Sequence, residues 1–162
     1  MIMIKSIPTV LYLEYRNYLN FAQNKCYENC GSMVLFQYGD NDFSQYCREN
    51  NYRIIYCLGF MKDCFGATHP HAWIRVDHNG ESIYCDPTLQ FTSSTWNFKR
   101  TQFHYSIVRE MTAQEIKEFF LLNYPDREIN DYGIPLGLCQ FPILSSDGKV
   151  LCAKDVKQGN LK

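Results

Sequence analysis

Three residue types in this chain could together perform nucleophilic chemistry. A cysteine nucleophile requires a lowered thiol pKa, a histidine that takes and returns the proton, and a group that fixes the orientation of the imidazole ring. Cys26 lies at the predicted start of a helix, where unpaired backbone N–H groups and the positive end of the helix dipole favour a thiolate. His71 and Asp86 lie on two predicted strands, which can supply the histidine and the orienting group.

The segment that joins His71 to Asp86 is typical of a β-hairpin, because Asn79-Gly80 separates two runs of strand-forming residues. A four-residue loop over 77–80 would place His71 directly opposite Asp86, with Cβ atoms about 4.5–5.5 Å apart. A two-residue turn at Asn79-Gly80 would instead place Asp86 opposite Trp73 and make His71 its diagonal neighbour, at about 7–8 Å. Both registers keep His71 and Asp86 on the same face of the sheet.

Three short motifs, taken in order, resemble papain-like and transglutaminase-like cysteine enzymes: Lys25-Cys26-Tyr27-Glu28-Asn29, His71-Ala72-Trp73 and Asp86-Pro87-Thr88. In that superfamily the cysteine begins a helix packed on an antiparallel sheet, and the histidine and aspartate come from neighbouring strands. The resemblance implies that Cys26 is the nucleophile, that His71 is the general base and acid, and that Asp86 orients the imidazole. It covers about residues 20–90.

Papain-like enzymes also place an oxyanion-hole side chain a few residues before the cysteine. Three side chains compete for this role here: Asn20, Gln23 and Asn24. We favour Gln23, and the backbone N–H of Cys26 could serve as a second donor with any of them. Trp73 is expected in the core or in the wall of the substrate pocket. Transglutaminases proper typically have a tryptophan directly after the cysteine, where this chain has Tyr27.

The elements that must position these residues predict an α+β fold. Helices are predicted over residues 10–22, 26–36 and 112–123, and Thr112 with Glu115 forms a capping box for the last. Gly31 would weaken the second helix unless close packing requires a small residue there. Strands are predicted over residues 53–58, 71–76, 81–86 and 102–108, with a small hairpin near 146–149. We therefore expect one domain over residues 1–162, with N-terminal helices packed on an antiparallel sheet.

Charge and cysteine usage restrict the partners and the compartment. The chain has 162 residues and a net charge of −1, which gives no basic field for nucleic acid. No apolar run approaches the roughly 18 residues of a membrane span. Eight cysteines are spread along the chain, with no small-residue cleavage site near the N-terminus and no Asn-x-Ser/Thr sequence. We therefore expect reduced thiols, a cytoplasmic location, and no association with nucleic acid or membrane.

The sequence thus favours a thiol-dependent amide hydrolase (a peptidase, amidase or glutamine deamidase) that acts on a protein or peptide amide without a cofactor or metal. One alternative is acyl transfer to an amine, as in transglutaminases. A second is a binding module without activity. A third is a zinc-stabilised domain, whose possible ligands are Cys57, Cys64, His69, His71 and Cys85. Zinc is the least favoured, because no Cys-x-x-Cys pair occurs. His69 is expected to be a solvated loop residue and Cys30 a core residue.

Overall fold

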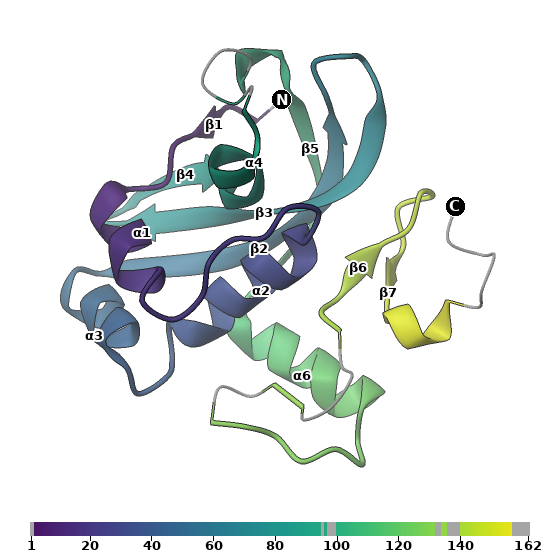
Figure 1. Ribbon diagram of the computed structural model, residues 1–162. Helices are drawn as coiled ribbons and strands as arrows, with labels where there is room; N and C mark the ends of the chain where they lie inside the picture. The colour runs from purple at the N-terminus through teal and green to yellow at the C-terminus, as the bar shows by residue number, and fades with distance from the viewer. Residues whose placement is uncertain (1, 95, 97–99, 132–133, 136–139, 157–162) are drawn as a thin grey trace.

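A five-stranded sheet lies at the centre of the computed structural model, which describes residues 2–94, 96, 100–131, 134–135 and 140–156. The strands are β1 (Ile4–Lys5), β2 (Tyr52–Lys62), β3 (Thr68–His78), β4 (Glu81–Cys85) and β5 (His104–Met111). Their order in the sheet is β1-β4-β3-β2-β5 (Figure 1). The β2–β3, β3–β4 and β2–β5 pairs are antiparallel.

The β1–β4 pair is parallel, so the sheet is mixed and the expectation of a purely antiparallel sheet is wrong at this edge. No tight turn joins these two strands, since helices and strands separate them along the chain. Their relative direction is therefore not restricted by a hairpin, and no local sequence pattern predicts it.

Helices cover one face and one end of the sheet (Figure 1). They are α1 (Thr9–Tyr15), α2 (Cys26–Phe36), α3 (Asp42–Glu49), α4 (Pro87–Thr92) and α6 (Ala113–Asn123). Helix α2 packs on β2 and β3, α4 contacts α2 and β3, and α1 packs against α3. A small two-stranded sheet, β6 (Ile143–Leu144) with β7 (Val150–Leu151), lies near the C-terminus, where a hairpin was predicted. The α+β class is therefore confirmed.

Two hydrophobic clusters occupy the opposite faces of the sheet, because successive strand residues point to opposite sides. The larger cluster contains buried residues of α2 and the even-numbered residues of the two central strands: Ile54, Tyr56, Leu58, Ala72, Ile74 and Val76. The smaller cluster contains odd-numbered residues of these strands and residues from both edges: Ile4, Cys57, Met61, Trp73, Trp96, Phe103 and Tyr105.

The sheet curls around the smaller cluster. Ile2, just before β1, forms an antiparallel bridge with Tyr105 of β5, and its backbone N–H donates to the Tyr105 carbonyl at 3.4 Å. The two edge strands therefore approach each other, and both contribute side chains to the same cluster. A polar side chain on this inner face is consequently shielded from solvent on several sides.

Gly59 permits the close approach of β5 and of Trp73 to β2. A Cβ atom at Gly59 would lie 2.0 Å from the carbonyl oxygen of Ser106 and 2.5 Å from Cη2 of Trp73. The β2–β5 register also shifts between Leu58 and Gly59. Only a residue without a side chain fits this position, so the packing of Trp73 against β2 depends on it.

The C-terminal part of the chain, which contains no recognised motif, folds back onto α2. A Cβ atom at Gly31 would lie 2.2 Å from the ring of Phe141, which explains why this helix tolerates a glycine. The Tyr56 hydroxyl donates to the Pro142 carbonyl at 2.6 Å. The segment at 140–144 therefore contacts the helix that begins with Cys26.

The first helix is shorter than predicted, and two helices were missed. Helix α1 ends at Tyr15, and beyond it the Tyr18 hydroxyl accepts a hydrogen bond from the backbone N–H of Asp42 at 2.8 Å. Asn41 and Ser44 form a capping box that starts α3. Helix α4 begins directly after Asp86, so the Asp-Pro sequence starts a helix.

None of the described helices is long and apolar enough to cross a membrane. The seven cysteines in the described residues are all free thiols, and Cys139 lies outside these residues.

Candidate active site

The β3–β4 hairpin brings His71 and Asp86 together. Ile74 pairs with Cys85 and His78 with Glu81, so the turn contains only Asn79 and Gly80. Of the two registers that the sequence left open, the two-residue turn is the one observed. Both turn residues have positive φ values, of 50° and 83°, as a type I′ turn requires.

Asp86 follows the last residue of β4 and occupies the N-cap position of α4. Its Oδ1 accepts a hydrogen bond from the backbone N–H of Leu89 at 3.1 Å. Its Oδ2 lies 2.7 Å from Nε2 of His71, which donates to it. Asp86 is fully buried and His71 is 7% exposed. The carboxylate is therefore fixed by a helix cap on one side and holds the imidazole on the other.

Tyr105 is a third partner of Asp86 that the sequence did not reveal. Its hydroxyl donates to the same Oδ2 atom at 2.6 Å. Burial, followed by the charge of Asp86, raises the pKa of Tyr105, so its hydroxyl remains a donor. Tyr105 lies on β5, well beyond Asp86-Pro87-Thr88 along the chain. No local pattern connects it with Asp86.

Trp73 lies in the core beneath the site. It is fully buried in the smaller cluster and packs edge-on against Tyr105, with ring centroids 5.0 Å apart. It does not line the pocket described below. Its position gives it a supporting role for Tyr105, and we expect no direct contact with a substrate.

Cys26 is the first residue of α2, as predicted, and is partly exposed. No side chain caps the start of this helix, so its first backbone N–H groups have no side-chain acceptor there. Burial by itself lowers the pKa of His71. The charge of Asp86 and its hydrogen bond, with smaller contributions from a hydrogen bond and the charge of Cys26, outweigh burial and raise this pKa to about 10. His71 is therefore an imidazolium at neutral pH.

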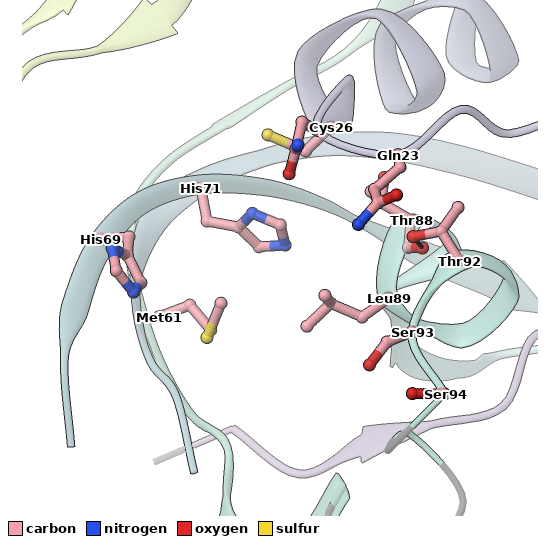
Figure 2. Close-up of a pocket in the computed structure, with 11 residues that line it drawn as sticks. Gln23, Cys26, Met61, His69, His71, Thr88, Leu89, Thr92, Ser93 and Ser94 are labelled. Atoms are coloured by element: carbon pink, nitrogen blue, oxygen red, sulfur yellow. Dashed lines mark hydrogen bonds between the residues drawn. The ribbon is translucent and has the colours of Figure 1, made fainter. Parts of the chain in front are cut away.

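Cys26 and His71 open into a pocket of about 600 Å³ (Figure 2). Its lining residues are Gln23, Asn24, Cys26, Met61, His69, His71, Thr88, Leu89, Thr92, Ser93 and Ser94. Figure 2 shows Gln23 and the α4 residues on one side, with Met61 and His69 on the other. Of the three candidates for the oxyanion hole, Gln23 and Asn24 line this pocket with Cys26, and Asn20 is absent from its wall.

His69 belongs to the pocket wall, although the sequence favoured a solvated loop position. It is half-exposed, and its Nε2 lies 2.8 Å from Oδ2 of Asp63. The other oxygen of Asp63 accepts hydrogen bonds from the backbone N–H groups of Phe65 and Ala67. A carboxylate in the β2–β3 turn therefore holds this second imidazole in place.

Among the described residues, the cysteines other than Cys26 are buried, except Cys64, which is partly exposed. Cys30 is fully buried and donates to the Ala72 carbonyl at 3.6 Å, and burial raises its pKa well above the usual value. Cys57 and Cys85 are also buried. Among the described residues, no three His, Cys, Asp or Glu side chains are grouped so that they could hold a metal ion.

Comparison of the chain with protein-family models, with curated proteins and with solved structures gives no match.

Proposed function

We propose that this protein is a thiol-dependent amide hydrolase of the papain-like and transglutaminase-like type, with Cys26, His71 and Asp86 as its catalytic triad. One observation carries the proposal: His71, held by the buried Asp86, lines the same pocket as Cys26, which begins a helix without a side-chain cap. Catalytic cysteines require a positioned imidazole and a local environment that favours the thiolate.

In the acylation step, the thiolate of Cys26 attacks the carbonyl carbon of an amide and forms a C–S bond. The carbonyl π electrons move onto oxygen, and the side chain of Gln23 with the backbone N–H of Cys26 stabilises this oxyanion. When the carbonyl re-forms, the C–N bond breaks and His71 gives its proton to the leaving amine. Asp86 keeps the ring of His71 aligned throughout.

In the deacylation step, neutral His71 takes a proton from water, whose oxygen attacks the thioester carbon. The C–S bond then breaks, Cys26 leaves as a thiolate, and the product is a carboxylic acid. A peptidase, an amidase and a glutamine deamidase all follow this course and differ in the amide they accept. The chemistry requires a reduced thiol, which fits a cytoplasmic enzyme with free cysteines.

Selective alkylation tests the proposal. The protein is treated with iodoacetamide near pH 6, and the rate at each cysteine is followed by mass spectrometry. Cys64 is a matched internal control, because it is also partly exposed but has no part in the triad. We expect Cys26 to react at least about tenfold faster than Cys64, and the His71→Gln variant to lose this advantage. Equal, slow labelling of both would contradict the proposal and favour a binding module without activity.

A further inference from the structure

The side chain of Asn29 binds the chain segment that precedes Cys26. Asn29 lies in α2 and is 7% exposed. Its Oδ1 accepts from the backbone N–H of Ala22 at 3.1 Å, and its Nδ2 donates to the carbonyl of Ala22 at 2.8 Å. The same Nδ2 donates to Oγ1 of Thr88 in α4 at 2.9 Å. One amide therefore joins the segment before the nucleophile to both α2 and α4.

Aromatic stacking fixes the residue before Ala22. The ring of Phe21 stacks with Tyr12 of α1 and Phe91 of α4, at centroid distances of 5.9 and 5.5 Å. Tyr12 and Phe91 also stack on each other at 3.9 Å. Asn24, three residues after Phe21, has a φ of 60°. Asparagine adopts this left-handed conformation more readily than most non-glycine residues, so Asn24 suits the turn that leads into Cys26.

Gln23 lies between Ala22, which Asn29 binds, and Asn24, which has a positive φ. It directly follows Ala22, whose backbone N–H and carbonyl groups both bind Asn29, and it directly precedes Asn24. Gln23 itself is exposed and lines the pocket with Cys26 (Figure 2). The position of its carboxamide relative to the nucleophile therefore depends on contacts made by its neighbours along the chain.

We propose that Asn29 is a positioning residue that places the carboxamide of Gln23 against the oxyanion formed on attack by Cys26. This inference rests on the proposed function, since it assumes an acyl-transfer reaction at Cys26. Asn29 touches no reacting atom in this scheme. It acts by holding Ala22, and through Ala22 the adjacent Gln23, in a single orientation before substrate binds.

Two reactions of the same thiol distinguish this role from a merely structural one. Acylation by 4-nitrophenyl acetate passes through a tetrahedral oxyanion, so it responds to the oxyanion donors. Alkylation by iodoacetamide is a direct displacement at carbon and forms no oxyanion, so it responds only to the thiolate and its access. The ratio of the two rate constants at Cys26 therefore reports on the oxyanion donors, and its change in a Gln23 variant reports on Gln23.

The test compares Gln23→Ala, Asn29→Leu and the double variant, with the nitrophenolate burst as the measure of acylation. Loss of one oxyanion donor costs about 100-fold in related systems, so we expect a fall of about this size in the acylation-to-alkylation ratio of Gln23→Ala. We expect Asn29→Leu to lower the ratio at least about tenfold, with alkylation within about twofold of wild type. The double variant should have the same acylation-to-alkylation ratio as Gln23→Ala, because both changes remove the contribution of the Gln23 carboxamide.

Asn123→Leu is the matched control, since it removes an asparagine that donates to the Phe119 carbonyl of α6, away from the pocket. It should leave the ratio unchanged. If Asn29→Leu does not fold, Asn29→Asp replaces it, because it keeps the bond from the Ala22 N–H and loses the two bonds that Nδ2 donates. This variant should also lower the ratio, because its carboxylate faces the Ala22 carbonyl without a hydrogen bond, and should remain non-additive with Gln23→Ala.

Two results would overturn the positioning role: an unchanged ratio in the Asn29 variant that folds, or independent effects that multiply in the double variant. Either result leaves the proposed function intact as long as wild-type Cys26 is alkylated faster than Cys64. Failure of that selectivity would instead remove the proposed function itself.

Discussion

At the scale of single residues, the site depends on one buried carboxylate. Asp86 accepts hydrogen bonds from the His71 ring, the Tyr105 hydroxyl and the Leu89 backbone N–H. A buried charge is tolerable only when such partners compensate its lost hydration. The same three hydrogen bonds fix the direction in which Asp86 faces the imidazole. The contacts that stabilise the buried charge are therefore also the contacts on which the proposed role of Asp86 depends.

Replacing Asp86 by asparagine tests the proposed role of this carboxylate in acylation. The Asp86→Asn variant keeps the size of the side chain but removes the charge that raises the pKa of His71. A neutral amide also permits the wrong ring tautomer, so we expect acylation of Cys26 by 4-nitrophenyl acetate at pH 7 to slow about 100-fold or more.

Asp77→Asn is the control for this change, because Asp77 lies on the same hairpin but pairs with Arg75 outside the pocket. It should retain wild-type acylation. Full acylation in Asp86→Asn would remove Asp86 from the mechanism.

Tyr105→Phe tests the hydroxyl that the sequence did not reveal. Removal of a hydrogen bond to a buried charged group costs about 1.5–3 kcal/mol, so the variant should unfold at a lower urea concentration. Tyr84→Phe is the matched control, because the Tyr84 hydroxyl donates to Glu110 in a partly exposed setting. The Tyr84 variant should lose less stability. Equal loss in both variants would show that burial beside Asp86 gives Tyr105 no special importance.

At the scale of elements, the curl of the sheet brings Tyr105 to Asp86. Tyr105 lies on β5, and Asp86 directly follows β4. Strands β3 and β2 lie between β4 and β5 in the sheet. Trp73 packs between the two central strands and Tyr105, and the space above Gly59 accommodates its ring. A side chain at Gly59 would push Trp73 outward and disturb the contact between Tyr105 and Asp86.

Gly59→Ala should therefore destabilise the protein by about 1–3 kcal/mol, as is usual when a packed core receives an extra methyl group. For a chain of this length, this corresponds to a fall in Tm of several degrees. Thermal unfolding measures it directly. A Tm within about 1 °C of wild type would mean that the backbone at β5 can move away at little cost.

Local sequence signals explain which parts of the site could be predicted. Cys26 begins a helix, and Asn79-Gly80 fixes the hairpin between His71 and Asp86, so each signal lies within a few residues of what it positions. Tyr105 and His69 had no such signal. The contact of Tyr105 depends on the curl of the whole sheet, and that of His69 depends on how far β2 and β3 extend beyond their predicted ends.

At the scale of the whole molecule, the His71–Asp86 pair couples folding to pH. The folded pKa of His71, about 10, is above the value of about 6.5 expected for an unfolded chain. The folded state therefore binds the His71 proton more tightly than the unfolded state does. The stabilisation is fully present below about pH 6.5 and is lost as the pH rises through about 10.

The difference in unfolding free energy between wild type and His71→Gln isolates this contribution, because the other titrating groups are common to both proteins. Urea unfolding at a series of pH values should show the difference to be largest near pH 6 and to shrink between about pH 7 and 10. A difference that stays constant, or grows with pH, would contradict a protonated His71 in the folded protein.

The most direct test of the proposed mechanism is to locate the acyl group. The protein is mixed with 4-nitrophenyl acetate, quenched in acid within the burst phase, digested, and mapped by mass spectrometry. The account predicts an acetyl thioester on Cys26 that disappears on further incubation at neutral pH and does not form in His71→Gln. An acetyl group on Cys64, or none on Cys26 at any time, would contradict it.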